Sequence, residues 1–223
     1  MRRIIGSLFV SLDGVIQAPG GPSEDWTGGF AQGRWLADLF DESVGEALDR
    51  WFSGQIDLLL GRRTYDIFSA YWPFVEGDGK PMGEMFDRVR KYVVTHRAEP
   101  LEWVSSHFVA TIDALRQIKH SDGPDLLIQG SGTLYPQLLA AGLIDRLTLM
   151  TFPVVLGRGE RWFGDAVPPA KLRMVDHGVS PTGTIVVTYE PAGPVLPGDA
   201  APPSSIPQAQ ARQERMKQEE EAR

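Results

Sequence analysis

Apolar positions in the first 190 residues alternate between short continuous runs and stretches with helical spacing. The first run, Arg3–Ser11, is rich in β-branched and aromatic residues and predicts a buried strand. Further short runs predict strands at Ile56–Leu60, Lys91–Thr95, Trp103–Val109, Leu126–Gln129 and Arg146–Pro153. Helical spacing predicts helices at Trp35–Phe52, Thr64–Tyr71, Met82–Arg90, Asp113–Lys119 and Thr133–Ala141. Strands and helices that alternate in this way indicate an α/β protein.

The last two apolar runs have a different connection. Leu172–His177 and Thr184–Tyr189 flank the sequence Ser-Pro-Thr-Gly at 180–183, a turn signal typical of an antiparallel hairpin. We therefore expect a mostly parallel sheet, covered by helices on both faces, with an antiparallel edge. Ligands of such sheets bind outside the carboxyl ends of the strands, so the loops that leave those ends are the places to search for a site.

Composition changes after Glu190. Residues 191–207 contain six of the 17 prolines, a density that suits an extended linker. Residues 208–223 are mostly helix formers, but Met216 is their one large apolar side chain, so a helix there has no face to bury. We expect a globular domain over 1–190 and a Pro/Ala-rich linker with a charged tail over 191–223. The tail is either solvated or packed on a partner subunit.

The charge balance and the missing cysteines narrow the function classes. A formal charge of -7 argues against a polyanion partner, so we expect no nucleic acid. The apolar run near the amino terminus is too short for a signal peptide or a membrane span, which predicts a cytoplasmic protein without a membrane partner. Without cysteine there is no disulfide, thiolate metal site or cysteine nucleophile. The histidines have no spacing suited to a metal, and no metal site is expected: His96, His107, His120 and His177.

Two predicted strand ends lead into similar glycine-containing loops. Gly61–Thr64 contains two arginines and a hydroxyl, and Gly130–Leu134 offers backbone N–H groups and two hydroxyls. Free N–H groups at a helix start bind anions, so the pair resembles the two sides of a diphosphate site, although either loop alone is also compatible with an ordinary turn. Tyr135 stands where the dinucleotide fingerprint G-x-G-x-x-G requires glycine, which argues against an ordinary Rossmann domain. At a third strand end, Thr95–Arg97 could bind a phosphate monoester or form a solvated loop.

The order of these segments resembles the dihydrofolate reductase superfamily. It most resembles the branch with the reductase domain of bacterial riboflavin-biosynthesis deaminase/reductases, the RibD C-terminal domain. The matching segments span essentially all of residues 3–190: Ser11–Ile16, Leu60–Tyr65, Tyr92–Arg97, Gln129–Tyr135, Pro153–Gly157 and Arg161–Phe163. The resemblance implies a dihydrofolate reductase-like three-layer α/β sandwich, with a mostly parallel central sheet and a C-terminal antiparallel hairpin. It also implies a homodimer.

The same resemblance implies NADPH as cofactor and hydride transfer to a carbonyl, imine or conjugated ring of a small molecule. Gly61, Arg62, Arg63 and Thr64 would lie near the cofactor phosphates, and Thr95, His96 and Arg97 near the 2′-phosphate. Gly130, Ser131, Gly132, Thr133 and Leu134 would cover the diphosphate, and Val10, Ser11 and Ile16 would border the nicotinamide. Asp13 is the candidate catalytic residue, as a proton relay or as an orienter of its loop.

The substrate stays open between alternatives. One is a reductase similar to the phosphoribosylaminouracil reductase of riboflavin biosynthesis, but the segments that hold the ribose phosphate there are not reproduced at 26–40 and 68–80. A second is dihydrofolate reduction, although no carboxylate on the helix predicted at 35–52 is clearly equivalent to the one that those enzymes use. A third is a non-catalytic NADP(H)-binding regulatory module. Several aromatic side chains could form a wall for a substrate ring or pack in the core: Trp26, Phe30, Trp35, Tyr71 and Trp72.

Overall fold

A computed structural model of the chain describes residues 1–163, 167, 169–195 and 206–222. The chain divides into two compact units, Met1–Gly193 and Pro194–Arg223. In the second unit, helix α6 (Pro207–Glu221) has no buried residue. Residues 196–205, most of the predicted linker, lie outside the described residues.

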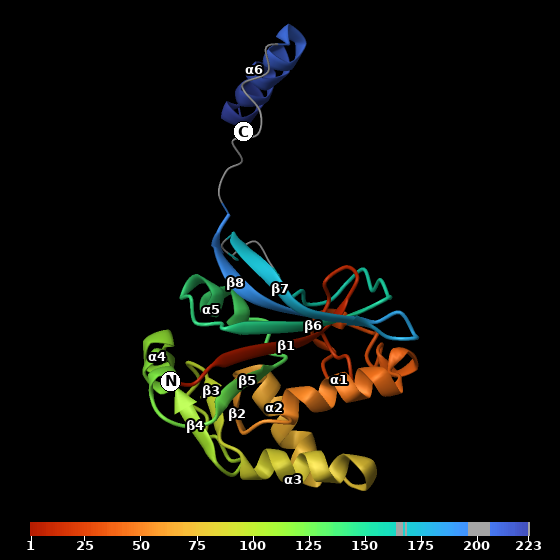
Figure 1. Cartoon of the computed structure of the whole chain (residues 1–223), viewed down its shortest axis with the longest axis vertical. Helices are drawn as coiled ribbons and strands as arrows, with labels where there is room; N and C mark the ends of the chain where they lie inside the picture. Colours follow the sequence, from red (N-terminus) through yellow and green to blue (C-terminus); the bar gives the residue numbers. More distant parts are fainter. Residues whose placement is uncertain (164–166, 168, 196–205, 223) are drawn as a thin grey trace. The chain divides into compact units, whose positions relative to one another are not determined.

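Over the described residues, eight strands form one sheet in the order β4-β3-β2-β5-β1-β6-β8-β7 (Figure 1). Strand β1 runs parallel to both of its neighbours, β5 and β6, and β8 pairs with β6 in the antiparallel direction. The predicted mostly parallel sheet with a C-terminal antiparallel hairpin is thus confirmed. The strands are β1 (Ile4–Ser11), β2 (Ile56–Gly61), β3 (Lys91–Val94), β4 (Ser106–Val109), β5 (Asp125–Gln129), β6 (Arg146–Phe152), β7 (Ala170–Val179) and β8 (Ile185–Pro194).

Helices cover both faces of the sheet. Successive side chains of a strand point to opposite faces, and in the central strands both sets are apolar and pack against helices. In β2, Leu59 packs in a core cluster with residues of α4 and α5, whereas Leu58 and Leu60 pack in a second cluster with residues of α2 and α3. A third cluster joins α1 to β6. The helices are α1 (Glu42–Phe52), α2 (Arg62–Tyr71), α3 (Lys80–Arg88), α4 (Ile112–His120) and α5 (Leu134–Ala140).

The helix predicted at Trp35–Phe52 is shorter than its apolar spacing suggested. Asp41 ends the preceding segment, because its Oδ1 accepts a hydrogen bond of 3.0 Å from the Val44 N–H and caps α1. Before it, Ala37–Leu39 forms a short 3₁₀ turn. Trp35 still packs on the core with its ring centroid 5.6 Å from that of Phe152, so the apolar positions were read correctly and the helix start was not.

The strand predicted at Trp103–Val109 begins three residues later. The Trp103 N–H donates to the Tyr65 hydroxyl at 2.9 Å, a side-chain partner that takes the place of a ladder bond. The hairpin strands β7 and β8 are longer than predicted, with ten residues each.

Candidate functional site

The two glycine-containing loops meet at the carboxyl ends of β2 and β5, which are neighbours in the sheet. The Gly61 N–H donates to Ser131 Oγ at 2.9 Å, and the Ser131 N–H donates to Thr64 Oγ1 at 3.1 Å. Gly61 is the N-cap of α2, and no side chain caps the first turn of that helix. The loops therefore form one continuous cradle, defined here as residues 61–64 and 130–134, with the start of α2 on one side.

The backbone of the second loop takes an unusual path. Gly130 and Ser131 both have left-handed conformations, with φ of 62° and 56°. Such a conformation is rare for a serine and is typical of functional turns. At the next position, a Cβ on Gly132 would lie 2.3 Å from Ile16 Cδ1, so any larger residue there would require the end of the Ile16 side chain to move.

A single carboxylate connects the third predicted loop to the cradle. Asp66 Oδ1 lies 2.7 Å from Arg62 Nε, and its Oδ2 lies 3.8 Å from Arg97 Nη1. Arg62 also donates to the Glu99 carbonyl at 2.9 Å and is mostly buried, whereas the Arg97 side chain is 64% exposed. Thr95 is buried and its Oγ1 accepts from the Arg97 N–H at 3.0 Å. Basic groups from the start of α2 and from the loop after β3 thus gather at one corner of the site, and Arg97 is the more accessible.

Asp13 lies in a dense set of hydrogen bonds. Its carboxylate accepts from the Ser11 hydroxyl at 2.7 Å and from the N–H groups of Leu156 and Gly157 at 3.1 and 2.8 Å. Arg161 lies 3.3 Å away. The hydrogen bond from Ser11 and then that from Leu156 lower the pKa of Asp13 to about 2. The carboxylate is ionised at neutral pH, and its contacts hold the backbone at 156–157 against the end of β1.

Residues 12–17 and 154–162 pair along their backbones. The Leu12 N–H donates to the Val154 carbonyl at 2.8 Å, and the Ile16 N–H donates to the Glu160 carbonyl at 2.9 Å. Between them, Val15 forms an antiparallel bridge with Arg161. The two segments therefore form a single wall beside the cradle.

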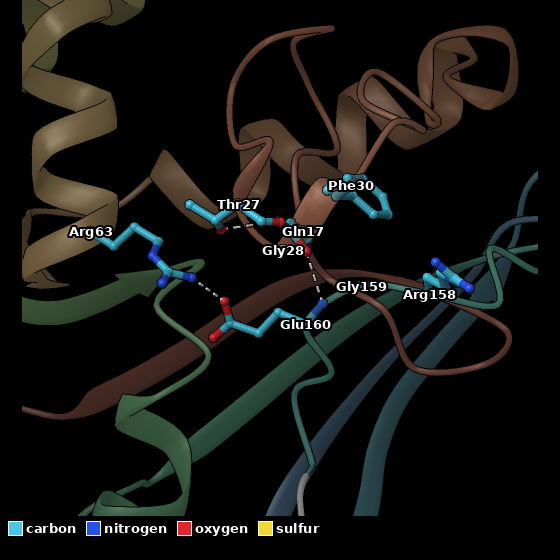
Figure 2. A pocket seen from close by; sticks show the side chains of 9 residues that line it. Gln17, Thr27, Gly28, Phe30, Arg63, Arg158, Gly159 and Glu160 are labelled. Carbon is cyan, nitrogen blue, oxygen red and sulfur yellow. Dashed lines mark hydrogen bonds and ion pairs between the residues drawn. The ribbon is translucent and has the colours of Figure 1, made fainter.

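A cavity of about 400 Å³ opens between this wall and the start of α2 (Figure 2). Phe30 supplies the one aromatic ring of the lining. Of the other aromatic candidates, Trp26 and Tyr71 are exposed, whereas Trp35 and Trp72 pack on core rings. The lining consists of Gln17, Thr27, Gly28, Gly29, Phe30, Arg63, Arg158, Gly159 and Glu160.

Not all predicted site residues point into this region. Val10 and Leu134 are buried in the core cluster under α5, and His96 is exposed at the third loop. Gln17 and Glu160, by contrast, line the cavity but were missed from the sequence. They are single polar residues in irregular loops, so no spacing or motif marks them.

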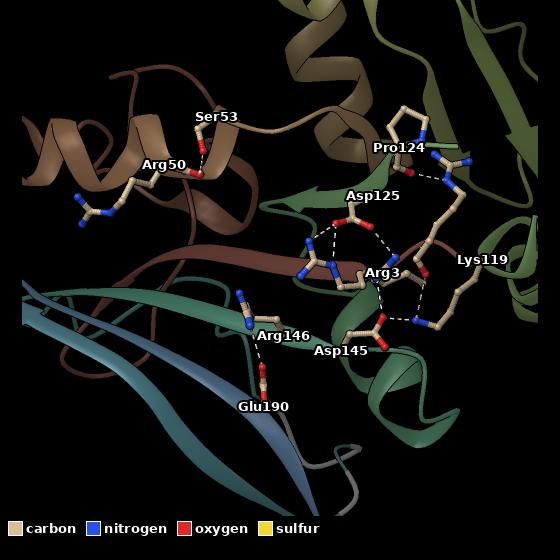
Figure 3. A network of polar contacts seen from close by, with 11 residues as sticks. Arg3, Arg50, Ser53, Lys119, Pro124, Asp125, Asp145, Arg146 and Glu190 are labelled. Carbon is tan, nitrogen blue, oxygen red and sulfur yellow. Dashed lines mark hydrogen bonds and ion pairs between the residues drawn. The ribbon is translucent and has the colours of Figure 1, made fainter. Parts of the chain in front are cut away.

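A second polar network lies at the amino ends of β1, β5 and β6 (Figure 3). Arg3 binds Asp125 through its backbone N–H and its Nε, both at 2.8 Å. Asp145 accepts from the Ile4 N–H at 2.7 Å and pairs with Lys119. These contacts join β1 to β5 and β6 and have a structural role.

In the part of the chain that the structure describes, no three histidine or acidic side chains are grouped as a metal would require. None of the described helices is long and apolar enough to cross a bilayer.

Known proteins resemble this chain over most of its length. A family model described as the RibD C-terminal domain matches residues 2–186. YyaP of Bacillus subtilis, an uncharacterized protein, is 28% identical over 192 residues, which cover 84% of this chain and 94% of YyaP. A putative riboflavin biosynthesis protein from Shewanella sp. PV-4 superimposes with a TM-score of 0.57 at 18% identity, over 85% of this chain and 99% of that one. Dihydrofolate reductase from Enterococcus faecalis, complexed with NADP(H), gives a TM-score of 0.51 at 14% identity, over 85% and 96% of the two chains.

The sheet order, the C-terminal hairpin and the cradle at the carboxyl ends of β2 and β5 define a dihydrofolate reductase-like α/β protein. The chain belongs to the RibD C-terminal domain family. The resemblance inferred from the ordered sequence segments is thus confirmed.

Proposed function

We propose that this protein is an NADPH-dependent reductase that transfers a hydride to a small heterocyclic or carbonyl substrate. The observation that carries the proposal is the cradle itself, two glycine-containing loops joined by the hydrogen bonds of Ser131. Family membership supports the reaction class. When bound, NADPH supplies the hydride that reduces the substrate.

The cradle has the donors that a diphosphate needs. The first N–H groups of α2 have no side-chain cap, and the helix dipole favours negative charge at that end. Arg63 lines the adjoining cavity, and Ile16 packs closely against Gly132 in the second loop. Gly61, Arg63, Thr64 and the 130–134 loop would hold the diphosphate, with Ile16 beside it.

The corner around Asp66 would distinguish NADPH from NADH. A 2′-phosphate is a dianion, for which arginine is the preferred partner because it forms paired, charge-assisted hydrogen bonds. The Arg97 side chain is 64% exposed, and its ion pair with Asp66 is long, at 3.8 Å, so it can turn to a ligand at little cost. Arg62 and Thr95 would support it from the buried side.

On the substrate side, the chain would mainly orient and shield. The cavity of about 400 Å³ has the size of a small-molecule site, and the Phe30 ring gives it an apolar surface. Because the pKa of Asp13 is lowered to about 2, this carboxylate would hold the wall at 154–162 in place and would not donate a proton. Alignment of donor and acceptor would then be the protein's largest contribution to rate.

Calorimetric titration with NADPH and NADH tests the cofactor assignment. We expect NADPH to bind more tightly than NADH. Arg97→Ala should lower the ratio of the two affinities about tenfold, because one charge-assisted contact is lost. Arg116→Ala on α4 is the matched control, since Arg116 is also an exposed arginine with an acidic neighbour. Equal affinity of the unaltered protein for the two cofactors would contradict the proposal.

Turnover requires a separate assay. NADPH oxidation, followed by absorbance, is measured with a panel of carbonyl compounds, pyrimidines and dihydrofolate. Oxidation that depends on one panel member supports a reductase and identifies its substrate class. Binding of NADPH without oxidation by any member would favour the regulatory module.

A further inference from the structure

The Arg63 side chain is already paired inside the cavity. Its Nη1 lies 2.7 Å from Glu160 Oε2 and 3.6 Å from Asp25 Oδ2. The other carboxylate oxygen of Glu160 faces the cradle, because a Cβ built on Gly132 would lie 3.7 Å from Oε1. Figure 2 shows the Arg63 and Glu160 side chains reaching toward each other from α2 and from the loop at 158–160. A negative group therefore lies between the cationic arm and the second loop of the cradle.

The backbone of Glu160 is fixed on both sides. Its N–H donates to Gln17 Oε1 at 3.0 Å, and its carbonyl accepts from the Ile16 N–H at 2.9 Å. Gln17 is itself buried, and its Nε2 donates to the carbonyls of Asp25 and Thr27 at 3.2 and 3.0 Å. The anchor holds the backbone and leaves the side chain free to rotate, so Glu160 can move its carboxylate without unfolding the loop.

We propose that Glu160 competes with the cofactor for Arg63. Its carboxylate occupies the position beside the Arg63 guanidinium that a phosphate group of the dinucleotide takes. This inference rests on the proposed NADPH site. A carboxylate and a phosphate cannot both lie against one guanidinium within the cradle without like-charge repulsion, so binding requires Glu160 to turn away. Asp25 lies further from the same Arg63 nitrogen, at 3.6 Å against 2.7 Å for Glu160, so Glu160 is the carboxylate that a bound phosphate would displace. Glu160 thereby lowers the affinity of the site for the cofactor.

The two neighbouring arginines are held differently. Arg62 binds Asp66 on its own helix, one turn away, and Arg97 is mostly exposed. Among the described ion pairs of these three arginines, the one between Arg63 and Glu160 crosses the cavity, from α2 to the wall that also holds Asp13. Release of Glu160 is therefore a local event at the diphosphate part of the site.

The test is a double-mutant cycle read by calorimetry with NADPH. Glu160→Gln keeps the shape and removes the charge, and we expect the dissociation constant to fall about three- to fivefold, the range of a partly exposed ion pair. In an Arg63→Met background the same change should give a smaller gain, because the competition for the guanidinium is then absent and only the repulsion between Glu160 and the phosphate is relieved. Asp113→Asn is the charge-matched control, because Asp113 is 92% exposed on α4, and it should leave the affinity within twofold.

Three results would overturn the inference. Weaker binding by Glu160→Gln would mean that Glu160 orients Arg63 for the cofactor and does not compete with it. An unchanged dissociation constant for Glu160→Gln would show that Glu160 does not compete with the cofactor. An equal gain in affinity in the Arg63→Met background would show that the competition is not for Arg63. If the unaltered protein binds no NADPH, the proposed function fails, and the cycle is repeated with inorganic pyrophosphate. Tighter pyrophosphate binding by Glu160→Gln would then support the competition alone, and no gain would overturn it.

Discussion

At the scale of single residues, Asp13 joins two segments that are 143 residues apart in the chain. One carboxylate accepts hydrogen bonds from its own loop and from the backbone of Leu156 and Gly157, and Arg161 balances its charge. The hydrogen bonds from Ser11, Leu156 and Gly157 favour the ionised form and outweigh the effect of burial, which is why the pKa falls to about 2. The stabilisation is present above the ordinary carboxyl pKa of 3.8 and is lost as the pH falls through about 2.

We expect Asp13→Asn to lower the free energy of unfolding by about 2 kcal/mol, the size of a hydrogen-bonded charge. Urea denaturation at pH 7 measures this effect, and Asp113→Asn is again the control. At pH 2 the difference in the free energy of unfolding between Asp13→Asn and the unaltered protein should shrink, because the carboxylate of the folded protein is then about half protonated. Unchanged stability together with complete loss of NADPH oxidation would instead favour the proton relay.

At the scale of elements, β1 approaches α5 closely at a glycine. A Cβ on Gly6 would lie 2.6 Å from Tyr135 Cε1 and 3.0 Å from Leu147 Cδ1. Tyr135 is completely buried, and burial raises the pKa of its hydroxyl group. The helix that begins at the cradle is thus seated directly on the central strand.

Gly6→Ala should push α5 away from β1 and lower the free energy of unfolding by about 1–3 kcal/mol, the usual effect of overpacking. Gly178→Ala is a matched control, because Gly178 also lies in a strand, β7, but a Cβ there meets nothing within 4 Å. Thermal melting compares the two variants. Because α5 follows the 130–134 loop, Gly6→Ala should also weaken NADPH binding, which the control should not.

Elements were predicted well where apolar spacing alone determines them. The central strands and the hairpin followed from apolar runs and one turn signal, and the ordered segments indicated the family. The start of α1 was misplaced because the hydrogen bond between Asp41 and Val44 overrides the apolar pattern. Glu160 could not be found, since its role depends on Arg63, which is 97 residues away in the chain.

At the scale of the whole molecule, the division into two units predicts that the second can be removed without effect on the first. Helix α6 has no buried residue, so removal of residues 196–223 should leave the melting temperature and the NADPH affinity unchanged. Differential scanning fluorimetry and calorimetry measure these two quantities. Sedimentation velocity on both chains tests the alternative that the tail packs on a partner subunit, which predicts a smaller assembly after truncation.

The central position of β1 also determines when the sheet can be completed during synthesis. The partners of Ile4 and Ser11 include Leu126 and Phe152, so the first strand made pairs with two of the later ones. At ribosomal rates of about 5–20 residues per second, roughly 7–30 seconds pass before β6 (Arg146–Phe152) has been made. For most of that time β1 has neither neighbour, because β5 is also made late in the chain. A nascent chain of this family should therefore be a substrate for chaperones that bind extended apolar segments.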